Sequence, residues 1–169
     1  MYCNMGINIK NMIGVIDLIG ISFEVPNEYG KILGAITTNV DVEKYFWYNV
    51  EAFDQTFKQD ITPPGDFLFK KETYNGHEFI DIINSHEYYT VFSKLQAYLK
   101  EAHYREINTY DEYINSDCEI LIIIVDCIFV DIFAKDVGVL KKVEEIAIQK
   151  QFKNIVHIET KNIAESGLG

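Results

Sequence analysis

The sequence predicts an α+β protein: a mainly antiparallel sheet with three to four helices packed on it. Two observations support this class. Candidate strands outnumber candidate helices, and most connections between them are short enough for hairpins. The exception is the last helix, which lies between two candidate strands and ends the chain in a strand–helix–strand unit. With 169 residues, 48% of them hydrophobic, the chain can bury the core of one domain.

The first unit of the domain is the stretch GISFEVPNEYGKILGAI, residues 20–36. Residues 21–25 indicate a strand, and Asn27 is expected to cap a helix whose apolar residues recur three and four positions apart. The glycines do not match a P-loop, which requires Gly-Lys-Ser/Thr, or a dinucleotide-binding fingerprint. The unit is therefore interpreted as structural.

The boundaries of the domain follow from where this patterning begins and ends. Residues 1–19 lack it and have no typical signal-peptide cleavage site. We expect an N-terminal extension over 1–19, a single domain over 20–160 and a flexible tail over 161–169.

The middle of the chain contains further candidate strands and a clear loop. Aromatic and β-branched residues indicate strands over 42–50 and 88–99. The segment 60–66 contains two of the three prolines and is predicted to be a loop. Thr109 and Glu112 form a capping-box pattern, which predicts a short helix.

The stretch 119–134 predicts a buried β-hairpin. Its two apolar runs are nearly continuous, which is typical of strands covered on both faces, and both are far shorter than the ~20 residues of a membrane span. A tight turn at Asp126-Cys127 would place Val125 opposite Ile128.

The longest helix is expected over 136–152, followed by a strand over 154–159. One side of this helix carries an apolar stripe, which we expect to face the sheet. The stripe consists of Val139, Leu140, Val143, Ile146 and Ala147.

The charge of the chain limits its partners. The formal net charge is −11, and it divides into −12 for residues 1–134 and +1 for residues 135–169. Nucleic-acid binding depends on Lys and Arg displacing counterions, so we expect no nucleic-acid partner and no membrane association. An acidic surface favours a basic protein partner. The alternative interpretation is that the charge serves only solubility.

No catalytic or metal-binding motif is recognisable. The three cysteines, Cys3, Cys118 and Cys127, lack metal-type spacing, and their odd number is typical of a reducing compartment such as the cytoplasm. The geometry of the hairpin argues against a disulfide between Cys118 and Cys127. The four histidines form no ligand pattern. We expect no catalytic residue, metal or cofactor, which favours a protein that is not an enzyme.

The candidate interaction patch consists of Tyr45, Trp47, Asp126 and Asp131. Tyr and Trp are frequent at protein interfaces. Strand alternation points Tyr45 and Trp47 to one face and their neighbours to the other, so one of these pairs belongs to the core. The two aspartates interrupt an apolar hairpin, where they are either ordinary turn and edge residues or part of a partner-facing acidic patch.

Four stretches in this order, GISFEVPNEYG, YFWYN, YYTVFSKLQAY and TYDEYINSDCEILIIIVDCIFVDIFAKD, resemble the domain-of-unknown-function family 2691. The resemblance extends from residue 20 to about residue 159. It implies a small bacterial, cytoplasmic, single-domain protein with residues 1–19 outside the fold. It implies no activity, ligand or catalytic residue.

Two functions from different classes follow. The leading hypothesis is a non-enzymatic interaction protein, of the inhibitor or immunity type, that sequesters a basic protein partner. The alternative is a small-ligand-binding or enzymatic α+β domain whose pocket is assembled from residues distant in the sequence. A contiguous acidic face would favour the first, and a deep pocket with convergent polar groups would favour the second.

Overall fold

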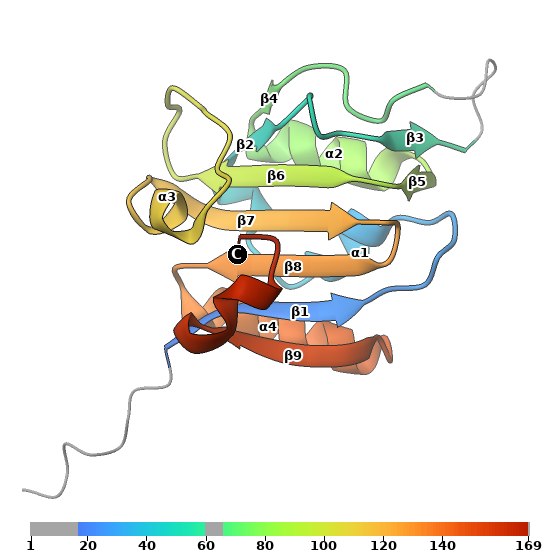
Figure 1. The fold of residues 1–169 in the computed structure, drawn as a ribbon. Coiled ribbons are helices and arrows are strands. Elements are labelled where there is room, and N and C mark those ends of the chain that lie inside the picture. The colour runs from blue at the N-terminus through green and yellow to red at the C-terminus, as the bar shows by residue number, and fades with distance from the viewer. Residues whose placement is uncertain (1–16, 60–65, 169) are drawn as a thin grey trace, which may run out of the picture.

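A computed structural model describes residues 17–59 and 66–168 and confirms the α+β class (Figure 1). Its centre is a seven-stranded sheet in the order β4-β2-β6-β7-β8-β1-β9, in which every neighbouring pair is antiparallel. In that order the strands are β4 (Thr73–Tyr74), β2 (Phe46–Asn49), β6 (Ser93–Tyr98), β7 (Cys118–Val125), β8 (Phe129–Ala134), β1 (Leu18–Glu24) and β9 (Lys153–Glu159). A two-stranded sheet joins β3 (Thr56–Lys58) to β5 (Tyr88–Thr90).

Helices cover both faces of the large sheet (Figure 1). On one face, here called the helix face, lie α1 (Ile32–Ile36), α2 (Gly76–Ser85) and α4 (Val137–Gln149). On the opposite face, the front face, lie α3 (Tyr110–Ile114) and the 3-10 helix η3 (Thr160–Glu165). A further 3-10 helix, η2 (Val42–Lys44), precedes β2. Each face has its own buried hydrophobic cluster.

The predicted hairpin lies in the middle of the sheet, where β7 pairs with both β6 and β8. Ile120, Ile122 and Ile124 belong to the core on the helix face, whereas Leu121 and Ile123 belong to the core on the front face. The alternation explains the continuous apolar sequence, because both faces of this strand are covered.

The turn of the hairpin differs from the prediction by one residue. Asp126 and Cys127 have positive φ angles of 51° and 70°, as a tight turn requires. Val125, however, lies opposite Phe129 and not opposite Ile128. The carbonyl group of Ile128 accepts a hydrogen bond from the Val25 amide at 2.9 Å, so Ile128 joins a neighbouring segment.

The last strand–helix–strand unit agrees with the sequence. The Asp136 side chain accepts a hydrogen bond from the Gly138 amide at 2.8 Å and caps α4. The expected stripe of five apolar residues is buried. The strand β1 lies between β8 and β9, so the helix crosses over one strand of the sheet.

Three predicted elements have different boundaries. The first helix begins at Ile32 and has no side-chain cap, so Asn27 does not cap it; the Leu33 amide instead donates to the Tyr88 hydroxyl at 3.0 Å. The predicted strand over 88–99 is divided into β5 and β6. The predicted strand over 42–50 begins with η2, and only its second half pairs in the sheet. Most of the predicted loop over 60–66 lies outside the described residues.

The C-terminal segment packs on the front face, where the sequence suggests a flexible tail. Leu168 is buried in the front-face cluster. The Gly167 amide donates a hydrogen bond to Oδ2 of Asp131 at 2.7 Å. A polar segment that ends in one buried leucine has no periodic pattern, so sequence reasoning could not detect this docking.

Candidate functional site

The four residues of the predicted patch do not form one surface. Tyr45 and Trp47 are 3% and 0% exposed and belong to the core on the helix face, where Trp47 stacks on Phe79 at 4.1 Å between ring centroids. Asp126 is exposed at the hairpin turn, whereas Asp131 is partly buried beneath the C-terminal segment. The structure therefore assigns the tyrosine and tryptophan to packing and leaves their strand neighbours on the front face.

One of these neighbours, Tyr48, lies under the loop of residues 99–109, which is held on the sheet by Gln96. The Nε2 atom of Gln96 donates to the Arg105 carbonyl oxygen at 2.9 Å, and its Oε1 atom accepts from the Ile107 amide at 3.0 Å. Gln96 is fully buried, so these bonds form away from competing water. They fix the path of the loop across the front face.

Lys94 provides a second anchor for the same loop. Its Nζ atom lies 2.7 Å from a carboxylate oxygen of Glu106 and 2.9 Å from the side-chain oxygen of Asn108. The Phe53 ring lies 4.9 Å from the same Nζ atom. Lys94 is only 5% exposed, and a buried ammonium group requires such partners to remain charged.

The anchored loop places Tyr104 on Tyr48. Their rings are stacked, with centroids 5.3 Å apart and planes inclined by 11°. Partial burial, followed by the nearby carboxylates of Glu72 and Glu106, raises the pKa of Tyr48. Partial burial likewise raises the pKa of Tyr104, and Glu101 adds to that effect. We call Tyr48, Tyr104, Glu72, Glu101 and Glu106 the tyrosine–carboxylate surface.

A shallow cavity of about 190 Å³ adjoins this surface. Glu101 and Tyr104 line it together with Phe46 of β2, and so does Lys71, whose charge is paired with Glu78. The surface thus combines aromatic area, negative charge and a recess, which together suit a basic side chain of a protein partner.

A second candidate site is a buried polar cluster on the opposite side of β2. It comprises Asn49, Asp54, Thr56, Thr90 and Ser93, each of which is at most 8% exposed. Thr56 and Thr90 are directly opposite one another in the two-stranded sheet. The backbone of Gln55 bonds to Val91 and Phe92, which brings Asp54 next to the start of β6. These residues come from two stretches that are distant in the sequence, 49–56 and 90–93, so no local motif marks them.

Asp54 is the titratable group of the buried polar cluster. Burial raises its pKa to about 6, while the nearby Thr56 and Asn49 side chains act in the opposite direction. Asn49 and Asp54 line a cavity of about 350 Å³ with Glu51, Phe67, Phe69 and Lys70. This cavity has the convergent polar groups that the alternative function requires.

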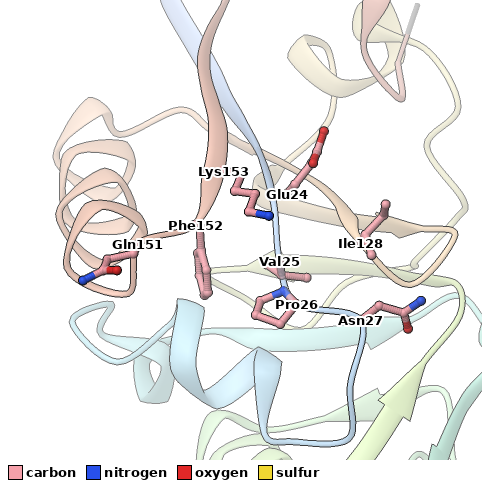
Figure 2. A pocket seen from close by; sticks show the side chains of 8 residues that line it. All are labelled: Glu24, Val25, Pro26, Asn27, Ile128, Gln151, Phe152 and Lys153. Atoms are coloured by element: carbon pink, nitrogen blue, oxygen red, sulfur yellow. The ribbon is translucent and has the colours of Figure 1, made fainter.

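A third cavity, of about 320 Å³, lies between the end of β1, the β7–β8 turn and the start of β9 (Figure 2). Its apolar lining includes Pro26, Ile128 and Phe152, and its charged groups are Glu24 and Lys153. None of its eight lining residues has an unpaired buried polar atom. We interpret it as a packing seam.

Several other chemistries find no support within residues 17–59 and 66–168. No cluster of three or more His, Cys, Asp or Glu side chains there has the arrangement of a metal site. Cys118 is a buried free thiol whose pKa burial raises to about 12, and Cys127 is also free. Among the helices of this part of the chain, none has the length and hydrophobicity needed to cross a bilayer.

The fold and its two candidate sites define a small α+β protein with an antiparallel sheet covered on both faces. The chain belongs to the family described as "Protein of unknown function (DUF2691)", whose model matches residues 18–168. The match begins at the first residue of β1. This membership confirms the family resemblance in the sequence.

A bacterial relative aligns along nearly its whole length. The "Uncharacterized protein YncE" of Bacillus subtilis strain 168 is 30% identical over 150 residues, which cover 88% of this chain and 97% of the relative. No solved structure matches the chain.

Proposed function

We propose that the chain is a non-enzymatic interaction protein, of the inhibitor or immunity type, that binds a basic protein partner through the tyrosine–carboxylate surface. The observation that carries this proposal is the stacked pair of Tyr48 and Tyr104 beside Glu72, Glu101 and Glu106. Rigid aromatic area flanked by charge is the composition of interface hot spots.

The charge distribution of the whole chain supports the same partner. The net charge of −11 attracts a basic protein over distances beyond direct contact and speeds their encounter. The surface itself contains two carboxylates, Glu72 and Glu101, that form no ion pair with any residue of the described segments. They are available for lysine or arginine side chains of the partner.

The rigidity of the loop of residues 99–109 also favours binding. Gln96 and Lys94 hold the loop before any partner arrives, so little conformational entropy is lost on association. The cysteine usage supports a reducing compartment, and we place this interaction in the cytoplasm.

A capture experiment with matched variants tests the proposal. The immobilised wild-type chain is compared with a Glu72→Gln/Glu101→Gln variant and with a Glu28→Gln/Glu145→Gln control, which changes the net charge equally at other exposed positions. A bacterial lysate at low salt is passed over each, and the retained proteins are identified by mass spectrometry. We expect basic proteins to be retained by the wild type and the control and lost from the Glu72/Glu101 variant. Equal retention by all three would refute a specific surface.

A further inference from the structure

The buried polar cluster presents hydrogen-bonding atoms that the protein itself leaves unpaired. The Oδ1 atoms of Asn49 and Asp54 and the hydroxyl groups of Thr56, Thr90 and Ser93 have no hydrogen-bond partner within the described part of the chain. Buried polar atoms are normally paired, because an unpaired one destabilises the folded state. Two of these atoms, Oδ1 of Asn49 and Oδ1 of Asp54, can only accept hydrogen bonds.

The two carboxylates of the same cavity also lack a direct ionic partner. Asp54 and Glu51 line it, and neither forms an ion pair with a described lysine, arginine or histidine. Lys70 also lines the cavity, but it pairs with Asp66, as does Lys58. A buried carboxylate without a cationic partner is a favourable place for a positively charged ligand.

The walls of the cavity restrict the shape of that ligand. Phe67 and Phe69 line it, and Phe67 is 43% exposed. Aromatic ring faces attract organic ammonium groups and pack against alkyl chains. The volume of about 350 Å³ lies at the small end of the range for ligand sites.

We propose that this cavity binds a small organic cation, a primary ammonium group on a short alkyl body. The ammonium group lies at the Asp54 carboxylate, and its charge is balanced by Asp54 and Glu51. The alkyl body lies against Phe67 and Phe69. This ligand supplies a positive charge for the two carboxylates and an apolar surface for the two phenylalanine rings.

Calorimetric titration with n-butylammonium chloride tests the site in the full chain. The controls are 1-butanol, which has a similar shape without charge, and potassium chloride at equal ionic strength. We expect n-butylammonium to bind, 1-butanol not to bind, and Asp54→Asn to weaken the affinity by about tenfold or more. Asp81→Asn, which removes an exposed carboxylate on α2, should leave the affinity unchanged.

Further measurements keep the proposal testable if Asp54→Asn does not fold. Phe67→Ala removes a partly exposed ring and is expected to weaken n-butylammonium binding by several-fold. Three results would overturn the proposal: no binding of n-butylammonium to the wild type, wild-type affinity in both Asp54→Asn and Phe67→Ala, or displacement of n-butylammonium by potassium at equal concentration. Tighter binding of Nα-acetyl-lysine amide than of n-butylammonium would overturn the assignment to a free amine and favour the lysine of a peptide. The capture experiment changes other residues, so the two tests fail independently.

Discussion

The phenol rings of Tyr48 and Tyr104 stack on the front face, with centroids 5.3 Å apart and planes inclined by 11°. Tyr48 lies in β2, and Tyr104 lies in the loop that follows β6. Their contact depends on Gln96, whose side chain bonds to the Arg105 carbonyl oxygen and to the Ile107 amide. A buried polar group in the sheet thus positions an aromatic group at the surface.

Replacement of Gln96 by Leu should release this loop. The Ile107 amide and the Arg105 carbonyl group would lose their partner, and an unpaired buried group reduces the free energy of unfolding by about 1–3 kcal/mol. Trypsin should then cleave after Arg105 faster than in the wild type. Urea denaturation and a proteolysis time course measure both effects, with Gln149→Leu on an exposed position of α4 as the control. An unchanged cleavage rate would show that Gln96 does not hold the loop.

Truncation of either Ile122 or Ile123 should strongly destabilise the protein. These side chains point to opposite faces of β7, and both are buried, at 1% and 2% exposure. Changing a packed isoleucine to alanine lowers the free energy of unfolding by about 2–5 kcal/mol. Urea midpoints of Ile122→Ala and Ile123→Ala check this. A negligible shift in both would remove the β7–β8 hairpin from the centre of the core.

Leu168→Ala tests the docking of the C-terminal segment. Leu168 is buried against the front face, so its truncation should reduce the free energy of unfolding by about 2 kcal/mol or more. A flexible tail predicts a change within about 0.5 kcal/mol. Chemical denaturation separates the two values, and Ile148→Ala, at a 62% exposed position, provides a matched control.

Asp54 should make the stability of the protein decrease as the pH rises. Its pKa in the folded chain is about 6, against the ordinary value of 3.8, so the folded state binds the proton more tightly. The contribution of Asp54 to the free energy of unfolding is therefore most favourable below about pH 4, and it falls between about pH 4 and pH 6. The shift corresponds to about 3 kcal/mol at neutral pH.

The Asp54→Asn variant measures this effect, because asparagine resembles the protonated carboxyl group. Without added amine, the variant should be more stable than the wild type at pH 7.5 by up to about 3 kcal/mol. The difference should vanish near pH 4. Urea denaturation at both pH values is sufficient, and a variant less stable than the wild type at pH 7.5 would contradict the burial of an uncompensated charge.

The elements that the sequence predicts well are those with a strong local pattern. The hairpin has continuous apolar runs, and α4 has a periodic stripe, so neither depends on distant residues for recognition. The alternation of side chains along β2 correctly placed Trp47 and Tyr48 on opposite faces of the sheet. It could not decide which face was covered, because that depends on α2 packing Phe79 against Trp47.

The two candidate sites depend on contacts between distant segments, which explains why the sequence did not predict them. Tyr104 reaches Tyr48 only because Gln96 and Lys94 fix the loop. From its residue type alone, Asp54 would be expected at the surface. In the structure it is buried next to the pairing of β3 with β5. Neither arrangement has a characteristic residue spacing.

The most direct test of the proposed function is hydrogen exchange on the complex with the most abundant basic protein that the wild-type chain captures. The tyrosine–carboxylate surface predicts slower amide exchange in β2 and in the loop of residues 99–109, with α4 and β9 unchanged. Slower exchange in α4 and β9, with β2 and that loop unchanged, would contradict the proposal.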